Sequence, residues 1–128
     1  MSRGISPAVR VLIVEDEGLI RWALAQTLIA AGATVVEAAD AQSAMAALHA
    51  ESRAFDVAVL DVRLPDGSGL GLLTTIRRLW PSTPVLLMTA FGTPELRQAA
   101  RALVAFGMVE KPFELDAMTG LIFGAVPA

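Results

Sequence analysis

The stretch DVAVLDVRLPDGSGLGLL, residues 56–73, decides the fold of this 128-residue chain. A short apolar run, Val57 to Leu60, ends on the carboxylate Asp61, and a turn of Pro, Asp, Gly, Ser and Gly follows closely. Short apolar runs that are rich in branched residues and lack polar alternation are typical of strands buried on both faces of a parallel sheet. The stretch therefore predicts a central strand whose carboxyl end presents an acid.

Other parts of the chain repeat this pattern and alternate with segments of helical length. Strands are expected at 9–14, 33–38, 55–60, 84–89 and 107–111. Helices are expected at 18–32, at 40–52, after the turn that ends on Gly69, at 93–106 and at 114–123. Strand and helix alternating five times predicts an α/β fold, a parallel sheet with helices on both faces.

Capping residues support three of these helices. Asp40 is a favoured N-cap residue at the start of the second helix. Thr93 followed by Pro94 is a helix start, with proline at the first helical position. Gly32 is a favourable residue just after the end of the first helix.

Composition limits the classes of protein to which the chain can belong. Its length suits a single domain, 1–128, with a core at about 9–123. The absence of cysteine excludes disulfides and thiolate metal sites and fits a cytoplasmic protein. The net charge of −3, with scattered basic residues, gives no sign of a nucleic-acid-binding face. The longest uncharged stretch, 79–94, is interrupted by Pro81 and Pro84 and falls short of the roughly 20 apolar residues of a membrane-spanning helix.

Polar side chains follow the predicted strands at one edge of the sheet, where ligands bind in such folds. They are Glu15 and Asp16 after the first strand, Asp61, Thr89 and Lys111. Acids that meet at one place raise one another's pKa unless a cation lies among them. Mg²⁺ prefers carboxylate oxygens, and a lysine and a hydroxyl at the same edge complete a site for a phosphoryl group, with a carboxylate as nucleophile.

Four motifs in sequence order carry a resemblance to a known family. VLIVEDE (11–17), VLDVRLPDGSG (59–69), LMTAFG (87–92) and EKPF (110–113) resemble the receiver domain of two-component response regulators. The amino-acid sequence around these motifs is especially similar to that of receivers of the nitrogen-regulation and phosphorelay kind. The resemblance implies a flavodoxin-like, doubly wound sheet of five parallel strands in the order 2-1-3-4-5, flanked by five helices.

The resemblance also implies a role for each residue at the strand ends. Asp61 would be an exposed phosphoacceptor for a histidine kinase or a histidine phosphotransfer protein. The group implied to bind Mg²⁺ or Mn²⁺ consists of Glu15, Asp16, Asp61 and the backbone carbonyl of Arg63. Lys111 and the hydroxyl of Thr89 would contact the phosphoryl oxygens. Such a protein assists its own phosphorylation and is not a turnover enzyme on small substrates.

Two departures from the family pattern concern the output. Receivers usually carry Tyr or Phe three residues before the lysine, where this chain has Met108. Our hypothesis is that the signal leaves through a modified face of the fourth helix and fifth strand, using Phe106 or Met108. Only GAVPA follows Phe123, so we expect a stand-alone receiver or one cut from a longer regulator. We expect it to be a monomer, or a weak dimer through the fourth helix, fifth strand and fifth helix.

Two functions from other classes remain alternatives. A phosphatase of the haloacid dehalogenase kind also uses an aspartate at a strand end, but it normally needs a second carboxylate two residues later, where this chain has Arg63. A binding module that works without phosphorylation would need none of the polar residues at the strand ends.

Overall fold

The strands predicted from apolar runs form the centre of the sheet. The computed structural model describes residues 8–127, so residues 1–7 and 128 of the predicted domain lie outside the described part. The sheet strands are β1 (Arg10–Val14), β2 (Thr34–Ala38), β3 (Val57–Asp61), β6 (Val85–Thr89) and β7 (Gly107–Glu110). The order β2-β1-β3-β6-β7, with parallel pairing throughout, confirms the predicted flavodoxin-like arrangement.

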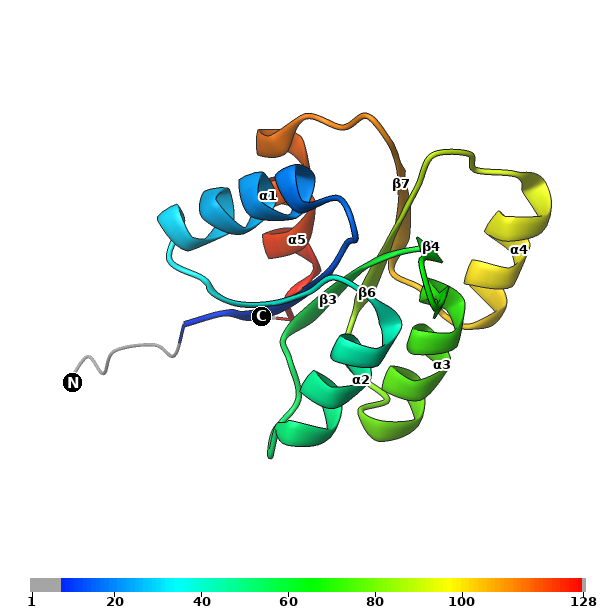
Figure 1. The fold of residues 1–128 in the computed structure, drawn as a ribbon, viewed down its shortest axis with the longest axis horizontal. Coiled ribbons are helices and arrows are strands. Elements are labelled where there is room, and N and C mark those ends of the chain that lie inside the picture. The colour runs from blue at the N-terminus through cyan, green and yellow to red at the C-terminus, as the bar shows by residue number, and fades with distance from the viewer. Residues whose placement is uncertain (1–7, 128) are drawn as a thin grey trace.

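The five predicted helices are also present and cover both faces of the sheet (Figure 1). They are α1 (Gly18–Ala30), α2 (Ala41–Ala50), α3 (Gly69–Leu79), α4 (Pro94–Ala102) and α5 (Leu115–Ala125). Helices α1 and α5 bury Leu24, Leu28, Met118 and Ile122 against one face of the sheet. Helices α2, α3 and α4 pack on the other face, where residues such as Leu48 and Ile76 meet the core.

Strands β1, β3 and β6 are buried because a helical layer covers each side of them. Odd-numbered residues of β1 join the α1–α5 side of the core and its even-numbered residues Leu12 and Val14 join the other side. Each fully buried Val, Leu or Ile side chain contributes about 1.5–3 kcal/mol. Both faces of these strands therefore need apolar residues, which explains the lack of alternation in the sequence.

The predicted capping residues act as expected. The Asp40 carboxylate accepts a hydrogen bond from the Ser43 N–H at 2.7 Å and completes a capping box at the start of α2. Thr93 accepts from the Leu96 N–H at 3.1 Å, and Pro94 begins α4. Gly32 has a φ of +101°, in the left-handed region that favours glycine after a helix.

Helix α4 is shorter than the expected segment 93–106, which was wrong at its end. The helix stops at Ala102, and Val104 has a left-handed φ of 58°. The Phe106 N–H then donates to the Val85 carbonyl at 2.8 Å. The chain is thus already paired with β6 where the sequence pattern still looked helical.

A feature not foreseen in the sequence lies directly after β3. Strands β4 (Arg63–Leu64) and β5 (Gly67–Ser68) form a small antiparallel hairpin around the Pro-Asp-Gly turn. Within residues 8–127, no helix is both long and apolar enough to cross a membrane.

Candidate phosphoryl and metal site

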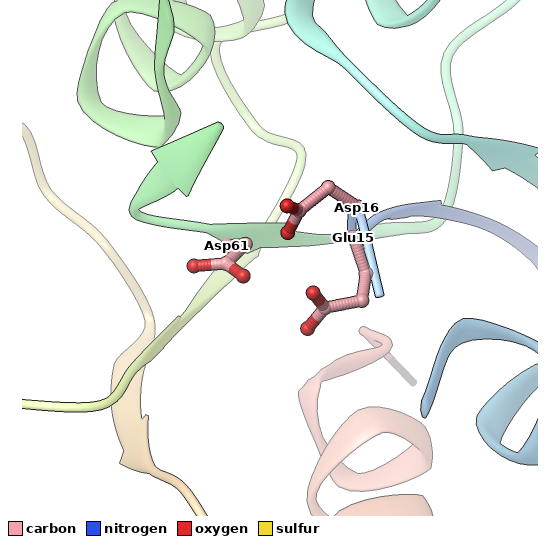
Figure 2. Close-up of side chains that lie close together, drawn as sticks. All are labelled: Glu15, Asp16 and Asp61. Atoms are coloured by element: carbon pink, nitrogen blue, oxygen red, sulfur yellow. The ribbon is translucent and has the colours of Figure 1, made fainter. Parts of the chain in front are cut away.

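Three carboxylates meet at the carboxyl edge of the sheet, as the sequence predicted. Val14 of β1 is in register with Leu60 of β3, so the residues that follow them leave the sheet at the same level. One oxygen from each of Glu15, Asp16 and Asp61 lies within 4.8 Å of the other two. Figure 2 shows the three carboxylates approaching one another from the ends of β1 and β3.

Lys111, the single lysine of the chain, lies among these acids. Its Nζ is 2.7 Å from Asp61 Oδ2, to which it donates a hydrogen bond, and 2.6 Å from Glu15 Oε1. Lys111 follows β7, and its N–H donates to the Thr89 carbonyl at 2.8 Å, which fixes the start of the side chain beside β6. The bond between Lys111 and Pro112 is cis.

Burial makes the acid at the end of β1 unusual. Glu15 is fully buried, and its pKa is raised from 4.5 to about 7. Desolvation is the largest cause, and Asp61 adds to it, whereas Lys111 and the Glu17 N–H act in the opposite direction. Burial alone would lower the pKa of Lys111, but its contacts with Asp61 and Glu15 outweigh burial, and the pKa lies above its ordinary value. Lys111 is therefore charged at neutral pH, whereas Glu15 is poised between its two protonation states.

Asp61 is less accessible than the sequence suggested. The expectation of an exposed nucleophile was wrong, because only 5% of the residue is exposed. It is reached through a pocket of about 420 Å³. The residues that line this pocket are Asp16, Glu17, Asp61, Val62, Arg63, Thr89, Ala90, Phe91, Thr93, Leu96 and Lys111. The pocket leaves the Asp61 carboxylate accessible from one side.

Thr89 lines the same pocket, but its hydroxyl is already engaged. The hydroxyl donates to the Phe91 carbonyl and accepts from the Phe91 N–H, both at 3.1 Å. Thr89 is 6% exposed, and the adjacent Ala90 leaves room at the rim. If this hydroxyl turned toward the pocket, both of its hydrogen bonds with Phe91 would break.

Arg63 contributes to the site through its backbone. Its N–H donates to Asp61 Oδ1 at 3.0 Å, while Lys111 binds the other oxygen of the same carboxylate. Gly69 makes this tight turn possible, since a Cβ at that position would lie 2.3 Å from the Asp61 carbonyl oxygen. Arg63 is exposed and lies two residues after Asp61. A phosphatase of the haloacid dehalogenase kind normally has an acid at this position.

The donor set fits a hard divalent cation. Glu15 Oε1 is buried and receives no directed hydrogen bond from the described residues, although Lys111 Nζ lies 2.6 Å away. We read this contact as a short ion pair and not as a hydrogen bond. Three carboxylates that offer oxygens within 4.8 Å of one another match the oxygen ligands that Mg²⁺ and Mn²⁺ prefer.

Comparison with known proteins agrees with this geometry. Residues 11–123 match the family described as the response regulator receiver domain. The chain belongs to this family. Receiver domains are phosphorylation-activated switches of two-component signalling and are phosphorylated by histidine kinases. They are signalling domains, and they bind Mg²⁺ through an acidic cluster of the kind formed by Glu15, Asp16 and Asp61.

Two curated regulators are similar to this chain over most of its length. The DNA-binding transcriptional regulator NtrC of Salmonella typhimurium is 35% identical over 126 residues, which are 98% of this chain and 25% of NtrC. The probable transcriptional regulatory protein TcrX of Mycobacterium tuberculosis is 39% identical over 116 residues, 91% of this chain and 49% of TcrX. This chain thus spans about a quarter of NtrC and about half of TcrX.

The fold is shared with a solved receiver of similar length. The chemotaxis response regulator CheY4 of Vibrio cholerae superposes with a TM-score of 0.84 at 30% identity, covering 94% of this chain and all of CheY4.

At the position of the usual receiver aromatic, Met108 is half-buried against the core between the sheet and α4. Phe106, two residues earlier, is 54% exposed. The exposed aromatic side chain of this region therefore lies directly before β7 and not within it.

Sequence reasoning missed one residue near the site. Asp66 lies in the turn after Asp61, where the sequence gives it no role beyond the turn, yet its carboxylate accepts hydrogen bonds from the N–H groups of Ala41 and Gln42, at 2.7 and 3.0 Å. No sequence signal joins these positions, because the contact spans distant parts of the chain.

Proposed function

We propose that Asp61 is the phosphoacceptor of this switch and that a histidine kinase or a histidine phosphotransfer protein supplies the phosphoryl group. The observation that carries the proposal is the meeting of Lys111, Glu15 and Asp16 around one carboxylate at the end of a pocket. An Asp61 oxygen bonds to phosphorus as the P–N bond to the donor imidazole breaks. The imidazole leaves with the electron pair and takes up a proton, and an acyl phosphate remains.

Glu15, Asp16, Asp61 and the backbone carbonyl of Arg63 would hold Mg²⁺, or Mn²⁺, next to the reacting carboxylate. Bound there, the ion supplies positive charge that offsets the charge of the phosphoryl oxygens. Lys111 stays within reach of both Asp61 and Glu15, so its ammonium can follow the new negative charge onto the phosphoryl oxygens. Small donors such as acetyl phosphate should also serve, since the receiver supplies these groups itself.

The phosphoryl group changes the surface by competing for hydrogen bonds. Thr89 exchanges its two contacts with Phe91 for the phosphoryl oxygens, which shifts the population of the segment leading into α4. The output then passes through α4 and β7, where Phe106 is exposed and Met108 replaces the usual aromatic. The chain works as one domain, a monomer or a weak dimer through the face formed by α4, β7 and α5.

Phosphotransfer profiling tests this proposal. The protein is incubated with labelled histidine kinases and phosphotransfer proteins from its own organism, with Asp61→Asn as the site variant. Asp116→Asn, an exposed acid on α5 outside the pocket, is the matched control. Label on wild type and Asp116→Asn, with none on Asp61→Asn, supports the proposal. Acid-stable label that persists in Asp61→Asn contradicts it.

A further inference from the structure

The hairpin after β3 contacts Asp61 and has little pairing of its own. The N–H of Arg63 in β4 donates to Asp61 Oδ1 at 3.0 Å, so the orientation of the carboxylate depends on where the hairpin lies. The hairpin has only two paired positions, Arg63 with Ser68 and Leu64 with Gly67. An isolated two-stranded hairpin is marginally stable in water even when it is longer. Contacts outside the hairpin must therefore keep it in place.

Asp66 at the hairpin tip supplies such contacts. Its two carboxylate oxygens accept from the first two N–H groups of α2, Ala41 at 2.7 Å and Gln42 at 3.0 Å. The positive end of the helix dipole favours a carboxylate at this place. Gly67 allows the close approach, since a Cβ there would lie 2.9 Å from the Cβ of Ala41. The hairpin tip thus rests directly on the start of α2.

The cap formed by Asp40 provides an internal comparison. Asp40 serves the same helix end through Ser43, whose N–H it binds at 2.7 Å. It makes none of the hydrogen bonds that join α2 to the hairpin. Asp40 and Asp66 therefore both cap α2, but of the two only Asp66 joins α2 to the hairpin.

We infer that Asp66 is a positioning residue for phosphoryl transfer: it anchors the hairpin on α2 and thereby holds the Arg63 peptide against Asp61. This inference rests on the proposed role of Asp61 as phosphoacceptor. Loss of the anchor frees the Arg63 N–H to leave Asp61 Oδ1, so the carboxylate turns away from the orientation that the metal and the phosphoryl donor need. Capping of α2 alone would have no such effect on the site.

The test compares Asp66→Ala and Asp66→Asn with Asp40→Ala. Three quantities are measured: the NMR shift of the Arg63 amide, the Mg²⁺ dissociation constant, and the rate of labelling by acetyl phosphate. Groups that contact a metal ligand directly, as the Arg63 peptide contacts Asp61, typically contribute 10–100-fold. Asp66→Ala acts on that peptide from the hairpin tip and should reach only the lower end of this range: Mg²⁺ binding and labelling about tenfold weaker and slower, with a moved Arg63 amide signal. Asp66→Asn keeps one acceptor oxygen and should show smaller changes in all three.

Asp40→Ala should lower the urea midpoint but leave all three quantities at the wild-type values. Equal effects of Asp40→Ala and Asp66→Ala, or an Arg63 amide signal unmoved in both Asp66 variants, would overturn the inference. Should Asp66→Ala fail to fold, Asp66→Asn decides by the same criteria. If wild-type protein takes no phosphoryl group, the proposed function fails, while the Arg63 signal still decides whether Asp66 positions that peptide.

Discussion

Replacing Lys111 with methionine should destabilise the protein in a manner that depends on pH. The substitution keeps a long side chain but removes the cation that lies 2.6 Å from Glu15 and 2.7 Å from Asp61. Removing one partner of a buried ion pair costs about 3–5 kcal/mol. The Lys111 side chain is 14% exposed, which favours the lower end, about 3 kcal/mol. With a urea dependence of about 2 kcal/mol per molar, the midpoint should fall by about 1.5 M.

The stability lost in Lys111→Met should increase with pH. Burial raises the pKa of Glu15 from 4.5 to about 7, and without Lys111 it rises further. A carboxylate whose folded pKa lies above its unfolded value loses stability as the pH rises through that interval. The pKa of Lys111 lies above 10.5, so wild type keeps its ammonium charge between pH 5 and pH 8.5. The loss is therefore largest near pH 8.5 and smaller at pH 5, where Glu15 is protonated in both proteins.

Urea unfolding at the two pH values, followed by tryptophan fluorescence, measures the effect. Trp80 packs edge-on against Phe55 and should change its emission on unfolding. Arg101→Met removes a charge from an exposed position on α4 and should stay within about 0.5 kcal/mol of wild type. Mg²⁺ should restore part of the stability lost in Lys111→Met, because the acids regain a cation. Equal midpoints for the two variants at pH 8.5 without metal would refute this reasoning.

Three further predictions concern the metal, the turn and the end of α4. In the proposed site Mg²⁺ must displace the proton of Glu15, whose pKa is about 7. Calorimetry should therefore show a Mg²⁺ affinity that is constant above about pH 8 and falls about tenfold per pH unit below about pH 6; pH-independent binding would speak against this role of Glu15. Gly69→Ala places a Cβ 2.3 Å from the Asp61 carbonyl oxygen and should cost about 3 kcal/mol in urea unfolding; an unchanged midpoint contradicts this. Val104 is 69% exposed and has a left-handed φ of 58°. Asn tolerates this conformation better than a β-branched residue, so Val104→Asn should add about 1 kcal/mol of stability and the β-branched control Val104→Thr should not. Equal thermal midpoints for the two variants would argue against backbone strain at this position.

The sheet and the meeting of the acids could be predicted because both follow from local patterns. Apolar runs without alternation identify strands covered on both sides. The predicted ends agree with the structure for β1, β2 and β6 and are one residue off for β3 and β7. Asp61 and Lys111 meet because parallel strands bring their carboxyl ends to one edge. The order of the strands came from the family resemblance and not from the pattern itself.

Burial and long-range contacts were not predictable in this way. Glu15 is fully buried and its neighbour Asp16 is exposed, yet nothing in two adjacent acids says which one turns inward. The anchor formed by Asp66 depends on α2, far away in sequence, and ordinary turn chemistry already explained the residue. Val104 gave no signal for the end of α4, because a β-branched residue rarely adopts a left-handed conformation.

The most direct measurement of the central claim is chemical trapping of the phosphorylated residue. Protein treated with acetyl phosphate and Mg²⁺ is reduced with borohydride, which converts an acyl phosphate of aspartate to homoserine, and is then digested for mass spectrometry. We predict homoserine at Asp61 and at no other position of the chain. Modification at another acid, with Asp61 left intact, would contradict it.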